Sequence, residues 1–130
     1  MKSSEVLQTI ANLMPVSEKS LPVKLSYAIS VNLGRLQKVA EDIGTARRKL
    51  LEKYSELDEE GKPVIKDGHY QIKDGEMPDL QKEMDQLMEE ENEIDIRKVD
   101  MAIIDKCDSP RCDMLSAKDI MAIDFMLNKE

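Results

Sequence analysis

The sequence predicts a mainly α-helical protein with a small β-hairpin: a long antiparallel helical hairpin or coiled coil, with the β-hairpin at its tip and short helices flanking it. Two apolar stripes indicate the two long helices, because alternating steps of three and four residues keep side chains on one helix face. The first stripe consists of Ile29, Leu33, Leu36, Ala40, Ile43, Arg47, Leu50, Tyr54 and Leu57. The second consists of Met77, Leu80, Met84, Leu87, Glu91 and Ile94. Between the stripes, Asp67-Gly68 separates two short β-rich runs, which is typical of a hairpin with a type I′ turn.

The elements form one domain, residues 1–130, which is long enough to bury a modest core. In chain order we expect a helix over 1–14, a long helix over 22–57, a β-hairpin over 58–75, a second helix over 77–92, a strand or helical extension over 93–104, and a C-terminal helix over 116–128. Ser3 or Ser4 is expected to cap the first helix and Pro15 to end it. Pro22 suits the first turn of the long helix, because that turn needs no N–H group from it.

The segment 93–104 admits two interpretations. Its apolar residues alternate but change phase partway, which fits a strand with a bulge; a continued helix is the alternative. A loop around Ser109-Pro110 is expected to follow. The last helix has a clear beginning, because Ser116 and Asp119 form a capping box.

The composition argues against several classes of function. The net charge is −8 and the pI is near 4.8, so the chain repels phosphate backbones on average and direct nucleic-acid binding is not expected. No apolar run approaches the roughly 20 residues of a membrane span, and a signal-peptide pattern is missing. We therefore expect a cytoplasmic protein with no membrane association, in which Cys107 and Cys112 are reduced.

Charge is segregated between the two long helices. Residues 35–53 carry six basic against three acidic side chains, whereas residues 76–95 carry nine carboxylates against Lys82 alone. Opposite fields favour docking of these helices, with Arg47 near Glu91; two solvated faces with incidental contacts are the alternative. Because the second stripe is shorter, the N-terminal helix, the C-terminal helix or a second copy of the chain must cover the rest of the first. We expect a homo-oligomer.

The chain contains no motif typical of catalysis. Its glycines form no phosphate-cradling pattern, and H-E-x-x-H and G-x-S-x-G are absent. His69, the only histidine, lies in the predicted hairpin and is interpreted as an exposed or half-packed strand residue. Cys107 and Cys112 are interpreted as ordinary thiols, with a zinc site or a redox disulfide as alternatives. We therefore expect no enzyme activity, no metal and no cofactor.

Two sets of charged residues are candidate binding sites. The basic set is Lys24, Arg35, Lys38, Arg47 and Arg48. Contributed by several chains, it would line a pocket for a small anionic nucleotide, because arginine suits phosphate geometry. The acidic set is Glu83, Glu89, Glu90 and Glu91. It would imitate a nucleic-acid backbone and bind another protein, although a solvated helix face is the simpler interpretation.

Five stretches form moderately specific architectural motifs: LPVKLSYAIS at 21–30, KLLEKY at 49–54, YQIKD at 70–74, EIDI at 93–96 and LSAKDIMAIDFML at 115–127. In these stretches the chain resembles a family of small proteins encoded by tailed phages and prophages of Gram-positive bacteria. The resemblance implies a phage origin and a place in the cytoplasm of an infected bacterial cell. It carries no catalytic signature and leaves the mechanism open.

Segregated charge, a surplus apolar stripe and the lack of catalytic residues together suggest a function. We expect a non-enzymatic phage protein that binds and inhibits or sequesters a host factor, as counter-defence. The factor would be a defence protein or its nucleotide signal. A tail or late-assembly accessory protein, or a chaperone, is the alternative, because the same helical features serve that role equally well.

Overall fold

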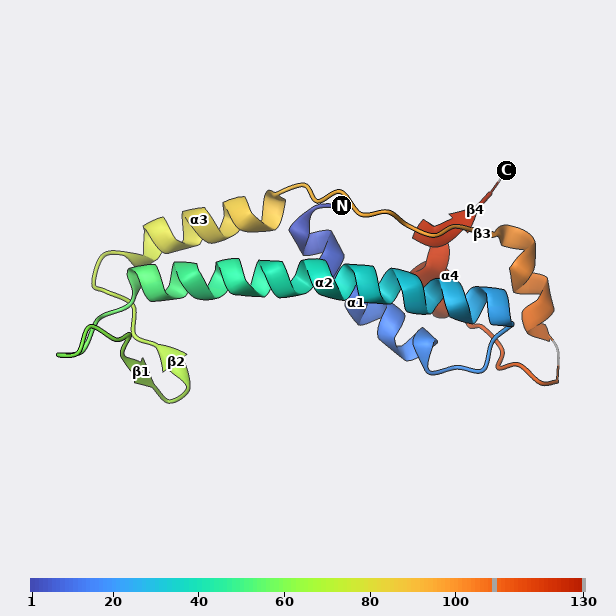
Figure 1. Cartoon of the computed structure of the whole chain (residues 1–130), viewed down its shortest axis with the longest axis horizontal. Coiled ribbons are helices and arrows are strands. Elements are labelled where there is room, and N and C mark those ends of the chain that lie inside the picture. The colour runs from blue at the N-terminus through green and yellow to red at the C-terminus, as the bar shows by residue number, and fades with distance from the viewer. Residues whose placement is uncertain (109, 130) are drawn as a thin grey trace.

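The computed structural model describes residues 1–108 and 110–129 as an elongated molecule built along one long helix. This helix is α2 (Val23–Tyr54), shown in Figure 1. Around its C-terminal end lie α3 (Met77–Glu89) and the β-hairpin, and at its other end lie α1 (Ser3–Ser17) and α4 (Ala117–Ile123). With 61% of the residues helical and one small antiparallel β-hairpin, the predicted fold class is confirmed.

Helix α1 differs from its prediction at both ends. Neither Ser3 nor Ser4 is its cap, because Ser3 is buried in the first turn and its N–H donates to the Glu90 carbonyl (3.0 Å). Pro15 lies inside the helix and does not end it. A proline in the last turn removes only one helical hydrogen bond, and the added residues bury Val16, which is 1% exposed.

Helix α2 is shorter than the predicted 22–57 because the chain is extended on both sides of it. Pro22 precedes the helix as its N-cap and does not enter the first turn. Beyond Tyr54, Ser55 adopts an extended conformation and forms an antiparallel bridge with Ile72. The end of the predicted helix therefore belongs to the base of the hairpin.

The β-hairpin forms where the sequence predicts it. Strands β1 (Ile65–Lys66) and β2 (His69–Tyr70) pair antiparallel, with Ile65 opposite Tyr70. Asp67 and Gly68 connect them with φ angles of 52° and 79°. Positive φ at both central residues is the signature of a type I′ turn, so this prediction is confirmed.

Helix α3 packs antiparallel on α2, which confirms the helical hairpin (Figure 1). It ends at Glu89 and not at residue 92, because the beginning of the chain pairs with the segment that follows. Lys2 and Glu91 form an antiparallel bridge, and the Asn92 N–H donates to the Met1 carbonyl (2.8 Å).

The segment 93–104 is neither a bulged strand nor a continued helix over most of its length. Strand β3 covers only Val99–Asp100 and pairs in parallel with β4 (Leu127–Asn128). The 3₁₀ helix η1 (Met101–Asp108) follows directly and shortens the predicted loop, whose Ser109 lies outside the described residues. Irregular chain before β3 runs alongside α2 (Figure 1).

The C-terminal helix predicted over 116–128 is divided into three parts. After α4 come the 3₁₀ helix η2 (Asp124–Met126) and then β4. The capping box is confirmed, because the Asp119 N–H donates to Ser116 Oγ (3.1 Å) and the Ser116 N–H donates to Asp119 Oδ2 (2.9 Å). The helix gives way to β4 because pairing with β3 completes the small parallel sheet.

The core lies mainly at the end of the molecule that contains α1 and α4. Its buried members are Val6, Leu13, Val16, Leu25, Ala28, Ile29, Leu36, Ile43, Ile103, Cys107, Ala122, Ile123, Met126 and Leu127. This part of the first apolar stripe is therefore covered within one chain, which was one of the alternatives. At the other end, Arg47 is exposed and Leu57 is 54% exposed.

Candidate functional site

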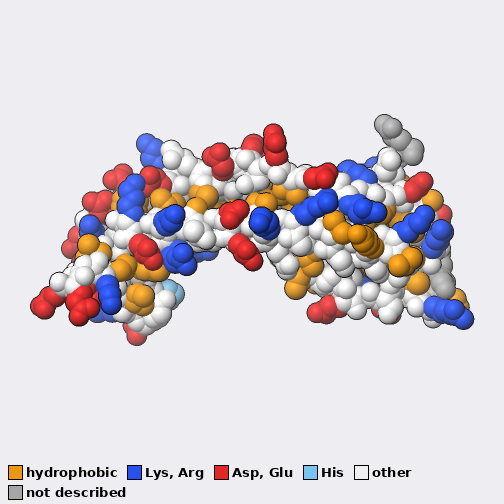
Figure 2. Space-filling view, viewed as in Figure 1, with side chains coloured by type: hydrophobic (Ala, Val, Ile, Leu, Met, Phe, Trp, Pro, Cys, Tyr) orange, Lys and Arg blue, Asp and Glu red, His pale blue; other side chains and the backbone are white. Residues whose placement is uncertain are grey.

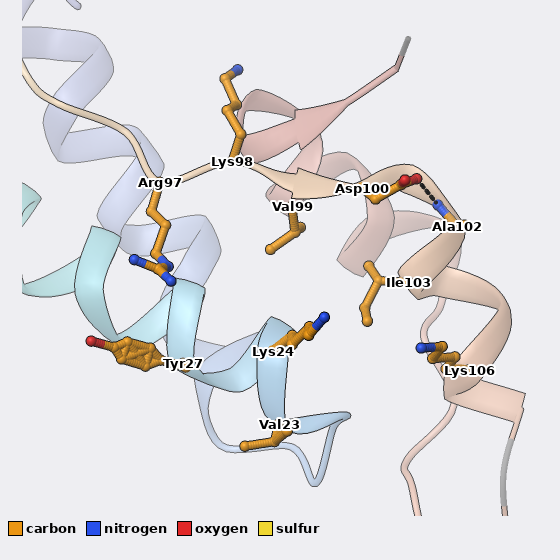
Figure 3. Close-up of a pocket in the computed structure, with 10 residues that line it drawn as sticks. All are labelled: Val23, Lys24, Tyr27, Arg97, Lys98, Val99, Asp100, Ala102, Ile103 and Lys106. Atoms are coloured by element: carbon orange, nitrogen blue, oxygen red, sulfur yellow. Dashed lines mark hydrogen bonds between the residues drawn. The ribbon is translucent and has the colours of Figure 1, made fainter.

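A cavity of about 670 Å³ opens where the start of α2 faces β3 and η1 (Figure 3). The lining residues are Val23, Lys24, Tyr27, Arg97, Lys98, Val99, Asp100, Ala102, Ile103 and Lys106. Lys24 and Tyr27 share one face of α2 because residues three apart are neighbours on a helix, and the same spacing brings Ile103 and Lys106 together on η1. The volume is in the range of small-molecule sites.

The cavity is cationic although the protein is acidic. Its cationic lining residues are Lys24, Arg97, Lys98 and Lys106. In the part of the chain that the structure describes, none of these four takes part in an ion pair. Among the lining residues that the structure describes, Asp100 is the one carboxylate, and it accepts the Ala102 N–H (2.9 Å) at the start of η1. An anion that entered the cavity would meet four cationic side chains against this single carboxylate, an excess of positive charge.

Arg97 is fixed to α2 through its backbone. The side-chain amide of Asn32, fully buried in α2, accepts the Arg97 N–H (2.7 Å) and donates to the Arg97 carbonyl (3.0 Å). This pair of bonds takes the place of a partner strand for the irregular chain before β3. The guanidinium lies 4.8 Å from the centroid of the Tyr27 ring, within cation–π distance. Asn32 is thus a positioning residue for one side of the cavity.

The lysines of the cavity are not equivalent. Lys98 Nζ donates to the Phe125 carbonyl (2.6 Å), and Figure 3 shows this side chain pointing away from Tyr27 and Lys24. Lys24 and Lys106 extend toward the same part of the cavity. Their ammonium groups are therefore the best placed to contact an anion inside it.

The structure places only one member of the predicted basic set at this cavity. Lys24 lines it, whereas Arg35 forms an ion pair with the irregular chain before β3 (3.5 Å). Arg48 pairs within α2 at 4.0 Å, and Lys38 and Arg47 are exposed farther along the same helix. Within one chain, the five residues do not form a common pocket.

Three of the cationic lining residues lie outside the predicted basic set: Arg97, Lys98 and Lys106. The available signal is the Arg97-Lys98 pair, which follows the acidic run 76–95 after a single residue, Ile96. Recognising its role requires knowing that this segment returns to the beginning of α2. No local spacing rule connects positions so far apart.

The acidic set is largely engaged within the chain, beginning with Glu83. Its carboxylate accepts hydrogen bonds from the Tyr54 hydroxyl and from Lys53 Nζ (3.1 Å), which join α3 to the end of α2. These bonds, with that of Tyr54 the stronger influence, lower the pKa of Glu83. The hydrogen bond to Glu83 also raises the pKa of Tyr54.

Two further acidic residues pair with the beginning of the chain. Glu89 forms an ion pair with Lys2 (2.8 Å), and the hydrogen bond between them raises the pKa of Lys2. Glu91 pairs with the N-terminal ammonium (3.5 Å) in place of the expected Arg47. Glu90 is exposed.

The cysteines and the histidine do not assemble a metal site. Cys107 is 2% exposed and its Sγ donates to the Ile103 carbonyl (3.7 Å), while Cys112 is half-buried. His69 is exposed on β2, as the sequence predicts. Over residues 1–108 and 110–129, no group of three or more His, Cys, Asp or Glu side chains is arranged to hold a metal ion.

Comparison with family models, with curated proteins and with solved structures finds no match for this chain. Within the described ranges, no helix combines the length and the apolar character of a membrane span. Fold and site together define a mainly helical protein with a cationic cavity between a long helix and the C-terminal third of the chain. The function has to be argued from that cavity.

Proposed function

We propose that this protein is a non-enzymatic binding protein that captures a small phosphorylated ligand in the cationic cavity. The observation that carries the proposal is the gathering of Lys24, Arg97, Lys98 and Lys106 around a cavity of about 670 Å³. Like charges at close range repel one another, and a bound anion removes that repulsion. Arginine and lysine together are the side chains that most often hold phosphate groups.

The charge of the whole molecule favours a small ligand over a polymer. The net charge is −8, and Figure 2 shows acidic side chains crowding the hairpin end of the molecule. A long polyanion would extend past the cavity and meet these carboxylates, whereas a ligand that fits the cavity avoids them. This argument agrees with the expectation that the protein does not bind nucleic acid directly.

The lining supports binding more than turnover. Among the described lining residues there is no histidine, cysteine or serine, and Asp100, the one carboxylate, accepts the Ala102 N–H with one of its two oxygens. Ammonium and guanidinium groups are hydrogen-bond donors without an acceptor atom, so they suit the holding of an anion.

The resemblance to phage-encoded proteins supplies a setting for this activity. A phage protein that captures a host signalling nucleotide would disable the defence that depends on the signal, so we propose sequestration as counter-defence inside the infected cell. We favour a nucleotide over a defence protein as the target because Glu83, Glu89 and Glu91 are paired within the chain. Self-association into a homo-oligomer stays part of this proposal.

Titration calorimetry with inorganic pyrophosphate tests the proposal, because this probe carries the phosphate charge without any other group. Lys24→Ala combined with Lys106→Ala removes the two best-placed ammonium groups. Lys49→Ala combined with Lys82→Ala is the matched control, since it removes the same charge from exposed positions outside the cavity. Native mass spectrometry of the same samples gives the number of chains and of bound ligands.

We expect the cavity variant to bind pyrophosphate at least about tenfold more weakly, because each lost contact to a charged group contributes about 1.5–3 kcal/mol. The control variant should bind as the wild type does. Equal weakening in both variants would mean that general charge, and not the cavity, attracts the probe. No binding by the wild-type protein would contradict the proposal.

A further inference from the structure

We propose that Tyr27 and Arg97 form a recognition site for an aromatic base, so that the ligand of the cavity is a nucleotide. This inference rests on the proposed function and specifies its ligand. It begins from Tyr27, a residue that is 51% exposed beside a cavity although the chain has only three tyrosines, one phenylalanine and no tryptophan. An aromatic ring left open to solvent offers a flat surface for stacking.

The Arg97 guanidinium lies over one face of the Tyr27 ring, so a base would stack on the outer face of the guanidinium or on the opposite face of the ring. The guanidinium lies 4.8 Å from the Tyr27 ring centroid, and Asn32 holds the Arg97 backbone in place through two hydrogen bonds. Guanidinium planes and tyrosine rings are both surfaces on which nucleic-acid bases stack. The pair therefore presents a preorganised platform at one side of the cavity.

The opposite side of the cavity carries the charge that a phosphate needs. Figure 3 shows Tyr27 and Arg97 together at one side, while Lys24 and Lys106 extend toward each other at the other. Apolar lining residues, among them Val99, lie between the two sides. A base on the platform, a sugar against the apolar wall and a phosphate between the lysines would follow this order.

The first turn of α2 adds to the attraction for phosphate. Lys24 and Tyr27 both belong to the beginning of a helix that runs from Val23 to Tyr54. The N-terminal end of a helix carries a partial positive charge, which favours an anion at that end. Base recognition and phosphate recognition are therefore built on the same turn, with η1 supplying the second ammonium group.

Titration calorimetry separates base recognition from phosphate binding. The probes are AMP, GMP, CMP and UMP against ribose 5-phosphate, which has the same sugar and phosphate without a base. Tyr27→Leu removes the ring and keeps an apolar side chain, and Tyr70→Leu in the hairpin is the matched control. Circular dichroism checks that each variant is folded. Because Tyr27 is exposed, we expect Tyr27→Leu to leave the fold intact.

We expect at least one nucleotide to bind about tenfold more tightly than ribose 5-phosphate, the effect of stacking one base on an aromatic ring. Tyr27→Leu should reduce that nucleotide's affinity to the level of ribose 5-phosphate, and Tyr70→Leu should leave it unchanged. If every nucleotide binds only as well as ribose 5-phosphate or pyrophosphate, base recognition is wrong while phosphate capture stands. If none of these phosphates binds, the proposed function itself fails.

Discussion

Replacing Asn32 by alanine should loosen the link between α2 and the chain before β3. The side chain is fully buried, and its amide accepts the Arg97 N–H at 2.7 Å and donates to the Arg97 carbonyl at 3.0 Å. A third contact reaches Met126 Sδ at 3.6 Å, in the 3₁₀ helix η2. One side chain therefore joins three parts of the fold that are distant in sequence.

The expected loss of stability follows from these contacts. Each of the two backbone hydrogen bonds contributes about 0.5–1.5 kcal/mol net, and the truncated side chain leaves a space in the core. The free energy of unfolding should fall by about 2–4 kcal/mol. That is a large share of the roughly 5–15 kcal/mol of a domain of this size, yet the variant should still fold.

Urea unfolding followed by circular dichroism measures this loss. Asn12→Ala is the matched control, because Asn12 is exposed on α1 and its side chain contacts only Gln8, at 2.9 Å, among the hydrogen bonds described. The control should change the free energy of unfolding by no more than about 0.5 kcal/mol. Pyrophosphate binding by the folded Asn32 variant should also weaken, because Arg97 loses its anchor.

A small effect would refute this reasoning. If Asn32→Ala costs less than about 1 kcal/mol, the two hydrogen bonds do not hold the segment against α2, because water replaces them without loss. If stability falls but ligand binding is unchanged, the amide serves the core alone and does not position the cavity.

Four further substitutions test other parts of the fold, each by urea unfolding. Gly34→Ala should raise the free energy of unfolding by about 0.5–1 kcal/mol, because the site is helical and an added Cβ meets no atom within 4 Å. Gly68→Ala should lower the free energy of unfolding by about 1 kcal/mol, because the φ of Gly68 is +79°. A change of the same sign in both variants would contradict this reasoning. Leu36→Ala should cost about 2–5 kcal/mol, since Leu36 is fully buried, and a cost below 1 kcal/mol would show that it is not in the core. The Ser116 backbone N–H, aided by a lysine ammonium, lowers the pKa of Asp119 below its ordinary 3.8. The stabilisation from the ionised Asp119 carboxylate is therefore complete above pH 3.8 and is lost as the pH falls through the lower folded-state pKa. Asp119→Asn should reduce the dependence of the free energy of unfolding on pH in this acid range. Identical acid profiles for the two proteins would oppose this assignment.

The features that the sequence predicts correctly depend on neighbouring residues. The two apolar stripes, the Asp67-Gly68 turn and the capping box at Ser116 each involve positions within a few residues of one another. Their geometry follows from local backbone preferences and from the spacing of one helix face. Such local signals do not depend on contacts with distant parts of the chain.

The errors arise where distant segments meet. Helix α3 stops at Glu89 because Lys2 pairs with the following residues, and α4 gives way to β4 because Leu127 pairs with Val99. Pro15 remains helical because the adjacent side chain is buried against the rest of the core. In each case a tertiary contact outweighs the local preference.

The candidate site is harder to predict from the sequence than the fold is. The sequence predicts Lys24 as a phosphate contact, but Arg97 and Lys106 reach the same cavity only through the path of the chain after α3. Besides the Arg97-Lys98 pair, the sequence offers one local hint: Asn32 is a polar residue directly before the stripe residue Leu33 within a strongly helical stretch. Its buried amide determines where Arg97 lies, and burial is not visible in a single sequence.

The two ends of the molecule depend on different lengths of the chain. The hairpin end uses residues close together in sequence, from the second half of α2 to α3. The cavity end requires α1, the start of α2 and the residues up to Leu127, which close the core behind η1. Because a protein is synthesised from its N-terminus, the residues of the hairpin end leave the ribosome before the residues of α4 and β4, which complete the core behind the cavity. Binding in the proposed site would therefore require the whole chain up to Leu127.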